Sequence, residues 1–429
     1  MGDRGYGMGS VHLPPFLPIP LLRSGFTRLS HIPMTSLSDL DIAGRRVLVR
    51  VDFNVPMAPA GDGAAHGGAI TDDTRIRAAV PTITAILAAG GRPVLMSHLG
   101  RPKGTPEAKY SLKPVADHLG TLLDAPVVFC PTTVGEAAEA CIAGAPAGAV
   151  VLLENTRFLP GETENDPALA DQMARLGDVF VSDAFGSVHR AHASTEGVAH
   201  RLPHAAGLLL AREVEFLTKA LDAPERPFVA VLGGAKVSDK IGVIEALAPK
   251  VDRLLIGGAM AYTFLKAQGH GVGASLVEDD RLDVARDLLA RFGDTLVLPT
   301  DHITADRFAA DADVQTETGD VADGRMGLDV GPETQARYAA IVRGARTVVW
   351  NGPMGVFEMV PFAAGTLAVA HAMAEATAAG ALTVVGGGDS VAAVEAAGLA
   401  EAVTHVSTGG GAMLEFMEGQ TLPGLAALE

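Results

Sequence analysis

The chain has 429 residues, 48% of them apolar and 19% charged, a length and composition that predict two or three globular domains with sizeable cores. Its 33 basic residues against 50 acidic ones give a net charge of −17, which argues against nucleic acid or an anionic membrane as a partner. The only two cysteines, Cys130 and Cys141, lack metal-ligand spacing. They predict free thiols in a cytoplasmic protein, and a disulfide between them is the alternative.

The first residues differ in composition from the rest. The stretch "LPPFLPIPLLRSGFTRLSHIP" is rich in proline, and its apolar run is too short and too interrupted to span a bilayer. We interpret residues 1–34 as an extension that is either disordered or the product of an early start codon, with Met34 as the true start. A targeting segment is the alternative.

From Arg46 onward, short β-branched and aliphatic runs alternate with Ala/Leu-rich stretches of helical spacing, such as residues 78–90. This alternation predicts an α/β fold of repeated βαβ units, with parallel sheets covered by helices on both faces. Continuous apolar runs at 47–49 and 150–153 fit strands buried on both sides.

In the first half of the chain, the predicted strands end in polar or charged residues. Because the carboxyl ends of parallel strands share one edge of a sheet, we expect these side chains to meet there. The residues are Asp52, Asn54, His98, Arg101, Asn155, Arg157, Asp183 and Arg190, with Arg75, His189 and His192 nearby. Guanidinium groups bind phosphate and carboxylate bidentately, so the cluster predicts a basic pocket for a small anion that bears both groups. The alternative is that each arginine pairs with a surface acid.

His189 and His192 also raise the question of a metal site. No third ligand stands at a matching interval, so we interpret both as anion-site or structural histidines.

The middle of the chain carries one helical pattern at Arg212–Leu221 before the next strand at Phe228. A helix that joins two α/β domains would act as a hinge. We therefore predict a first domain at 35–211 and a second at 212–413.

In the second half, the predicted strands end in glycine. In "GGGDSVAAVEA" and "TGGGAMLEFM" a helix follows the glycines directly, so backbone N–H groups and the helix N-terminus would bind an anion. Asp389 at such a turn would repel bare phosphate but suits a Mg²⁺ ion held between carboxylate and nucleotide. For any single turn, ordinary loop chemistry is the alternative.

Lys236 and Lys240 follow the strand–glycine stretch "VLGGAK". Being four residues apart at the expected start of a helix, they are predicted to share a face and to point at phosphate. Solvated surface lysines are the alternative.

Two common nucleotide motifs are absent. No G-x-x-x-x-G-K-[ST] occurs, which excludes a P-loop, and no G-x-G-x-x-G occurs, which disfavours an NAD-dependent dehydrogenase. An anion pocket in one half and a nucleotide and Mg²⁺ site in the other predict phosphoryl transfer between a nucleotide and a small phosphorylated acid.

From about Ser36 to its end, the sequence resembles the phosphoglycerate kinase family. The resemblance rests on ten motifs in the family's order: "RVDFNVPM", "ITDDTRIRAAVPTI", "MSHLGRPKG", "ENTRF", "SDAFGSVHRAHAST", "LGGAKVSDKI", "MGLDVGPET", "WNGPMGVFE", "GGGDSVAAV" and "VSTGGGAMLE". It implies two doubly wound, Rossmann-like domains with a ligand cleft between them, and a C-terminal segment, 414–429, that returns to the first domain.

The resemblance also implies which residues bind each substrate. For 3-phosphoglycerate or 1,3-bisphosphoglycerate they are Asp52, Phe53, Asn54, Arg75, His98, Leu99, Gly100, Arg101, Arg157 and Arg190. For Mg-ADP or Mg-ATP they are Lys240, Glu358, Gly387, Gly388, Asp389 and Ser390, with Glu358 at the ribose and Asp389 on Mg²⁺. Arg75, Lys236 and the Gly409–Gly411 amides, centred on Gly410, would neutralise the transferred phosphoryl group.

The implied activity is reversible, direct transfer of an acyl phosphate to ADP by a monomer whose domains close on their substrates. The alternative is a non-catalytic nucleotide-binding relative, but Arg75, Lys236 and Asp389 are all present. The chain departs from the family's usual pattern at an insert, residues 58–69, which we expect to be a flexible surface loop, at Ser390 and Met413, and in its N-terminal extension.

Overall fold

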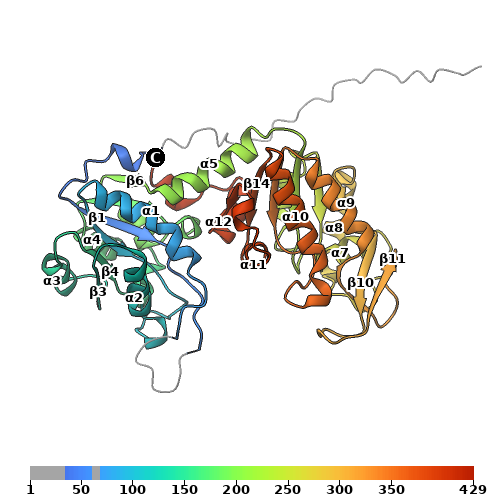
Figure 1. The fold of residues 1–429 in the computed structure, drawn as a ribbon, viewed down its shortest axis with the longest axis horizontal. Coiled ribbons are helices and arrows are strands. Elements are labelled where there is room, and N and C mark those ends of the chain that lie inside the picture. Colours follow the sequence, from blue (N-terminus) through green and yellow to red (C-terminus); the bar gives the residue numbers. More distant parts are fainter. Residues whose placement is uncertain (1–33, 60–67) are drawn as a thin grey trace, which may run out of the picture.

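The computed structural model describes residues 34–59 and 68–429, which form two lobes side by side (Figure 1). Each lobe is built on a parallel sheet of six strands with helices on both faces. The prediction of two doubly wound α/β units is therefore confirmed. Within the described ranges, no helix is both long enough and apolar enough to cross a membrane.

The sheet of the first lobe has the strand order β3-β4-β2-β1-β5-β6. Side chains of the central strand alternate between two cores: Val47 and Val49 pack with α1 and α2, whereas Leu48 packs on the opposite face. The elements are β1 (Arg46–Val51), β2 (Arg92–Met96), β3 (Val127–Cys130), β4 (Val150–Leu153), β5 (Val179–Asp183), β6 (His204–Ala206), α1 (Thr74–Ala88), α2 (Lys113–Leu122), α3 (Glu136–Gly144) and α4 (Pro167–Ala174).

The sheet of the second lobe has the order β15-β14-β13-β7-β8-β9. Val229 and Val231 of β7 pack with α9 and α10, and Phe228 and Leu232 pack on the other face. The elements are β7 (Phe228–Leu232), β8 (Arg253–Ile256), β9 (Leu296–Val297), β13 (Thr347–Asn351), β14 (Leu382–Gly386), β15 (His405–Val406), α6 (Ile241–Leu247), α7 (Met260–Ala267), α8 (Leu282–Phe292), α9 (Pro332–Arg343), α10 (Ala364–Ala378) and α11 (Gly388–Ala396).

A small antiparallel sheet in the second lobe was not predicted. Its strands β10 (Asp301–Ala305), β11 (Val314–Thr318) and β12 (Met326–Val330) pair in the order β11-β10-β12. The side chains of β11 are mostly exposed and polar, so this strand lacks the apolar pattern on which the prediction of strands depended.

Helix α5 (Leu208–Asp222) runs from one lobe to the other (Figure 1). It begins four residues before the predicted start at Arg212. The reason lies in its capping contacts: the hydroxyl of Thr82 accepts from the Leu208 N–H at 3.0 Å, and Asp183 Oδ1 accepts from the Leu209 N–H at 2.9 Å. These partners are distant in sequence and satisfy amides that a helix leaves unpaired.

The last part of the chain packs against the first lobe. Helix α12 (Gly410–Met417) lies between the lobes, and α13 (Pro423–Ala426) follows it. Phe416 meets Phe185 edge to face with ring centroids 6.5 Å apart, and the Gly424 N–H donates to the Val188 carbonyl at 2.8 Å.

The two ends of the insert, residues 58–69, are joined to each other by backbone pairing where they meet the first lobe. Met57 and Ile70 form an antiparallel bridge, and the Ala58 N–H donates to the Ala69 carbonyl at 2.8 Å. The predictions for residues 60–67 and 1–33 lie outside the described residues. Cys130 and Cys141 are both free thiols.

Candidate active site

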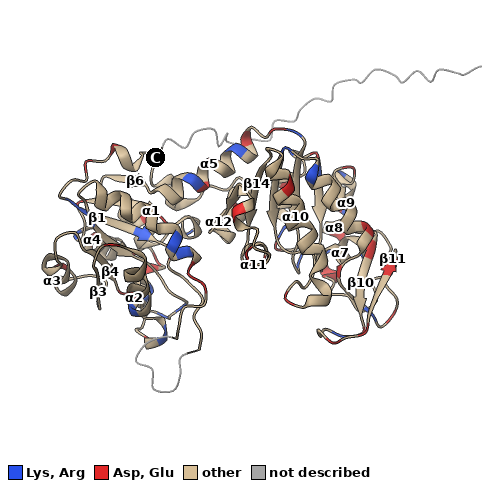
Figure 2. Ribbon diagram, viewed as in Figure 1, with Lys and Arg blue, Asp and Glu red and all other residues tan. Residues whose placement is uncertain are grey.

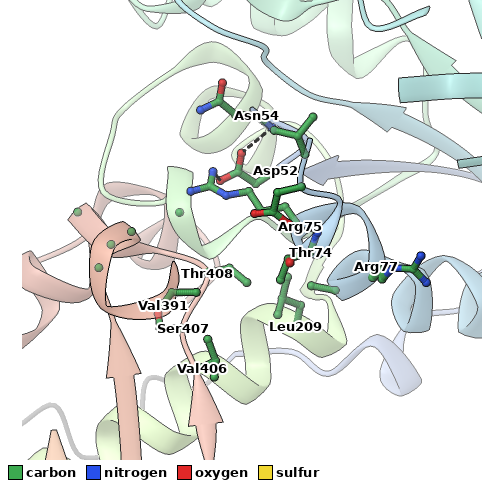
Figure 3. Close-up of a pocket in the computed structure, with 18 of the residues that line it drawn as sticks. Asp52, Asn54, Thr74, Arg75, Arg77, Leu209, Val391, Val406, Ser407 and Thr408 are labelled. Atoms are coloured by element: carbon green, nitrogen blue, oxygen red, sulfur yellow. Dashed lines mark hydrogen bonds and ion pairs between the residues drawn. The ribbon is translucent and has the colours of Figure 1, made fainter. Parts of the chain in front are cut away.

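A cavity of about 1100 Å³ lies between the two lobes. It is open at the carboxyl ends of strands in both sheets, where doubly wound proteins bind ligands. Figure 3 shows Asp52 and Arg75 on one wall and Val391, Ser407 and Thr408 on the wall that faces it. Basic residues mark the end of α1 that points toward the second lobe (Figure 2).

The first lobe contributes a carboxylate and an arginine that are paired with each other. Asp52, which directly follows β1, accepts from Arg75 Nη1 at 2.9 Å. Its other oxygen, Oδ1, accepts from the Asn54 N–H at 3.2 Å. The side chain of Arg75 is 34% exposed and comes from the first turn of α1. Asp52 therefore orients an arginine that remains open to a ligand.

The turn after β2 is fixed by side chains from neighbouring strand ends. Asn54 Oδ1 accepts from the Gly100 N–H at 2.8 Å, and Arg157 Nη1 donates to the Gly100 carbonyl at 2.7 Å. Burial and the nearby Arg190 lower the pKa of Arg157 to about 10, so it stays charged at neutral pH. Its Nε is buried without a hydrogen-bond partner in the described part of the chain. This guanidinium keeps capacity for an anion.

The histidines of this wall are neutral at physiological pH. Burial, followed by the charge of Arg190, lowers the pKa of His189 to about 4, and burial followed by Arg50 lowers that of His192 to about 3. Burial and Arg50 also lower the pKa of His98 well below its usual value. Arginine therefore supplies the positive charge of the pocket. No group of three potential metal ligands occurs among the described residues.

In the second lobe, the two lysines do not share a helix face as predicted. Helix α6 begins only at Ile241, and Lys236 and Lys240 both precede it. The chain first turns at Gly234, where φ is +120°, and makes a tight turn from Val237 to Lys240. Lys236 is exposed, whereas Lys240 is 9% exposed and donates to Asn351 Oδ1 at 2.5 Å. Burial lowers the pKa of Lys240, and the acids Asp239 and Asp389 oppose that shift.

Two glycine turns open helices at the cavity. Gly387 precedes α11 with φ +92°, a conformation that favours glycine, and Gly409 precedes α12. The turns touch: a Cβ on Gly410 would lie 3.4 Å from the Cα of Gly387. Gly387, Gly388 and Gly410 all line the cavity, so two helix N-termini with unpaired N–H groups meet there.

The start of α12 also reaches the basic wall of the first lobe. A Cβ on Gly411 would stand 3.5 Å from His189 Nε2, and one on Gly186 would stand 3.4 Å from the Thr408 carbonyl oxygen. Buried Glu213 of α5 secures this turn by accepting from His405 Nε2 at 2.7 Å and from the Thr408 N–H at 2.7 Å. The amides of α12 therefore stand between the two halves of the cavity.

Asp389 is exposed in the first turn of α11, and no side-chain hydrogen bond or ion pair engages it within 34–59 and 68–429. An unpaired carboxylate beside a helix N-terminus fits a Mg²⁺ ion that a nucleotide's phosphates also hold. Ser390 is buried and its hydroxyl accepts from the Gly352 N–H at 2.6 Å, so it shapes the backbone here. Glu358 is exposed in the turn after β13.

The structure brings most of the predicted residues together. Those that line the cavity are Asp52, Asn54, Arg75, His98, Gly100, Arg101, Arg157, Arg190, Gly387, Gly388 and Gly410. Lys236, Lys240, Glu358, Asp389 and Ser390 are not in its lining. The side chains of Phe53 and Leu99 belong to the core of the first lobe.

Other lining residues were missed by sequence reasoning, among them Thr74, Leu209, Arg212, Val391 and Glu395. Thr74 of α1 donates through its hydroxyl to Glu395 of α11 at 3.2 Å, a contact between lobes across 321 residues of sequence. No local pattern signals such a pairing. The class of protein that this arrangement fits is a kinase of small phosphorylated molecules, because one wall offers cations to an anionic substrate and the other offers helix N-termini to a nucleotide's phosphates.

Comparisons with known proteins identify the family. The phosphoglycerate kinase family model matches residues 37–420. A phosphoglycerate kinase of Chloroflexus aurantiacus is 58% identical over 400 residues, which cover 92% of this chain and 98% of that protein. The chain belongs to the phosphoglycerate kinase family, and it is an enzyme of that family.

A phosphoglycerate kinase of Deinococcus radiodurans is 56% identical over 425 residues, which cover 98% of this chain and 99% of that protein. Because so little of this chain is left unmatched, most of the N-terminal extension has a counterpart there. The expectation that the extension lacks one in the family is therefore wrong for this relative.

Solved structures agree with the assignment. The phosphoglycerate kinase of Coxiella burnetii superposes with a TM-score of 0.80 at 43% identity and covers 92% of this chain and 99% of its own. The phosphoglycerate kinase from Pyrococcus horikoshii also gives a TM-score of 0.80, at 32% identity, over 92% of this chain and 98% of its own.

Proposed function

We propose that this enzyme transfers the acyl phosphate of 1,3-bisphosphoglycerate reversibly to ADP, which yields 3-phosphoglycerate and ATP in glycolysis and gluconeogenesis. The observation that carries the proposal is one cavity with arginines on its first-lobe wall and glycine-opened helices on its second-lobe wall. Such a cavity can hold an anionic acid and a nucleotide's phosphates with their reacting ends facing each other.

The first-lobe wall binds the phosphoglycerate. Arg157 and Arg190 hold its phosphate and carboxylate, the turn His98–Arg101 supplies backbone and side-chain donors, and Asp52 with Asn54 keeps that turn and Arg75 in place. Phe53 and Leu99 contribute only their backbone, because their side chains are buried in the core.

Transfer is direct, without a covalent enzyme intermediate. The bond between phosphorus and the acyl oxygen breaks while a bond to the terminal oxygen of ADP forms, so the carboxylate leaves with the electron pair. Arg75 from one lobe, Lys236 from the other and the Gly410 amide neutralise the charge on the moving phosphoryl group. The exposed Lys236 is free to reach it, and no proton-transfer catalyst is needed.

The second lobe binds the nucleotide. The turn Gly387–Ser390 and the buried Lys240 hold its phosphates, and Glu358 holds its ribose. Asp389 holds the nucleotide's Mg²⁺, which offsets phosphate charge when bound. Replacement of Asp389 by Asn is expected to raise the Mg²⁺ concentration needed for half-maximal rate, and an unchanged requirement would contradict this role.

We also propose that residues 35–211 with 414–429 and residues 212–413 form two domains that close on their substrates about α5 in a monomeric, cytoplasmic enzyme. Ligands held on separate lobes support closure, since their reacting groups must be brought together. X-ray scattering should show a smaller radius of gyration with both substrates bound. Profiles that are identical with and without them would refute closure.

The first experiment is ATP- and Mg²⁺-dependent turnover of 3-phosphoglycerate, coupled to NADH oxidation through glyceraldehyde-3-phosphate dehydrogenase. The full chain and a version that starts at Met34 are compared. Activity in both supports the proposal and shows the extension to be dispensable. Folded protein that binds Mg-ATP without turnover would instead favour a non-catalytic nucleotide-binding relative.

A further inference from the structure

Arg50 is a buried cation beneath the basic pocket that none of the roles above uses. It lies within β1, where its neighbours at 47–49 and 51 are all apolar, and only 1% of it is exposed. Each nitrogen of its guanidinium group nevertheless has a hydrogen-bond acceptor. It donates from Nε to Ser194 Oγ at 2.8 Å, from Nη1 to the Val51 carbonyl, and from Nη2 to His98 Nδ1 at 3.1 Å and Ser187 Oγ at 3.5 Å.

A buried carboxylate balances this charge through a serine. Ser194 donates its hydroxyl proton to Glu162 Oε1 at 2.6 Å, and its N–H donates to Glu162 Oε2 at 3.0 Å. The same hydroxyl accepts from Arg50, so one serine links the two buried charges. A buried arginine is tolerated when its charge is compensated and its donors are satisfied. The network therefore holds the guanidinium group in one orientation.

The contact to His98 determines where the imidazole proton lies. A guanidinium group can only donate hydrogen bonds, so Nδ1 of His98 must present its lone pair to Arg50. Neutral His98 then carries its proton on Nε2. The Asp52 carboxylate does not compete for Nδ1, because its Oδ1 is 3.9 Å away, which is beyond hydrogen-bond distance.

The other ring nitrogen is left for a ligand. His98 lines the cavity, and no hydrogen-bond acceptor for its Nε2 is found in the parts of the chain that the structure describes. Among the described residues, the charged groups that face the ring are the cations Arg50, Arg75, Arg157 and Arg190 and the carboxylate of Asp52. Four cations and burial disfavour the imidazolium form.

We propose that Arg50 is a positioning residue that locks His98 in the neutral Nε2–H tautomer, so that this N–H donates to an oxygen of bound phosphoglycerate. The inference rests on the proposed function for the identity of the ligand. It gives the pocket a donor that does not change with pH across the physiological range, whereas a histidine free to titrate would lose a proton there.

The first test uses the wild-type protein labelled with ¹⁵N-histidine, with the His98 signals assigned by comparison with His98→Gln. Long-range ¹H–¹⁵N spectra are recorded between about pH 5.5 and 8, where an ordinary histidine titrates. We expect one protonated nitrogen, Nε2, one unprotonated nitrogen, Nδ1, and no titration. A proton on Nδ1, an averaged pair of signals or titration in this range would each overturn the proposal.

The second test compares Arg50→Met and Arg50→Lys with Arg46→Met, a matched control at the other end of β1 where Arg46 pairs with Asp178. Arg50→Met should lose the single tautomer and raise the KM for 3-phosphoglycerate roughly tenfold, with a smaller effect on kcat. Arg50→Lys, which keeps a donor, should recover part of both effects, and Arg46→Met should change neither.

Ser194→Ala provides the same readout if Arg50→Met does not fold, because it removes the Nε acceptor but keeps Arg50. We expect it to broaden or split the His98 signals. A raised KM in Arg50→Met with the tautomer unchanged would reduce Arg50 to a structural residue. A different result would overturn the proposed function itself. If the wild-type protein shows no turnover, and its locked His98 Nε2–H does not respond to added 3-phosphoglycerate, then phosphoglycerate is not the ligand.

Discussion

The two lobes line one cavity with opposite kinds of chemistry. The first lobe presents charged side chains, such as Arg75 and Arg157, each oriented by contacts to neighbouring strand ends. The second lobe presents backbone at Gly387 and Gly410, where helices begin. We therefore expect ligand binding by the first lobe to depend on the charges of its side chains. Ligand binding by the second lobe should instead be lost when a substitution adds a Cβ to one of its glycines. The exception in the second lobe is the exposed Lys236 before α6, which adds a side-chain charge.

The largest effect is expected from Lys236→Ala. Lys236 is exposed before α6, so its charge can act on the phosphoryl group as it moves. Loss of one preorganised charge should lower kcat roughly 10²- to 10³-fold, with little change in the KM for 3-phosphoglycerate. Steady-state kinetics would measure both, with Lys266→Ala on α7, which pairs with Asp279, as the control. An equal loss of phosphoglycerate affinity with kcat unchanged would contradict the assignment.

Arg157→Ala should act in the opposite way, on binding rather than on rate. Its removal takes away a charged donor and the bond to the Gly100 carbonyl. We expect the KM for 3-phosphoglycerate to rise roughly tenfold to a hundredfold, with kcat changed much less. Arg45→Ala, on a surface ion pair with Asp41, is the control. An unchanged KM would remove Arg157 from the pocket.

The backbone wall is tested by Gly387→Ala. At φ +92° an alanine is strained, and its Cβ would lie 3.0 Å from Asn351 Nδ2. We expect a loss of about 1–2 kcal/mol in the free energy of unfolding and a raised nucleotide KM. The matched variant is Gly388→Ala, whose Cβ has no atom within 4 Å in the described structure, and it should be as stable as wild type or more so. Equal stabilities for the two variants would show that the turn is not strained.

The smallest effect is expected in the pH dependence of the free energy of unfolding, through a buried histidine of the first lobe. Folded His189 has a pKa of about 4 against 6.5 in an unfolded chain, so unfolding takes up a proton as pH falls from 6.5 to 4. The free energy of unfolding therefore falls over that window, whereas buried Asp183, whose pKa is raised to about 7, contributes in the opposite direction. In His189→Gln, the pH dependence measured by urea denaturation should be shallower by at most about one proton. An unchanged slope would show that His189 is not neutral in the folded protein.

The local sequence pattern predicted the strands and the polar residues that follow them. Apolar runs located the strands of both sheets, and the residues after them located Asp52, Arg101 and Arg157, because parallel strands bring their carboxyl ends together. The helix start at Leu208 was missed, since it depends on caps from Thr82 and Asp183, which lie far back in the sequence.

The long-range contacts of the connecting helix and between the lobes could not be predicted either. Glu213 with His405 and Thr74 with Glu395 are separated by 192 and 321 residues, and each residue looks like an ordinary helix or strand position by itself. The placement of Lys236 was wrong for a local reason, because the turn at Gly234 delays the start of α6 to Ile241. Arg50 did carry a signal: a charged residue inside an apolar strand implies a buried partner, which Ser194 and Glu162 supply.

The contact between Gly424 and Val188 has a consequence for biosynthesis. The first lobe is translated first, yet the helix that covers its 185–197 region is made only after the second lobe. At the usual rate of about 5–20 residues per second, the intervening stretch takes roughly 10–50 s to synthesise. Throughout that time Phe185 and Val188, which are fully buried in the folded chain, lack their contacts to Phe416 and Gly424. Chaperones that recognise apolar segments should therefore engage this lobe on the ribosome and leave it only when α13 has docked.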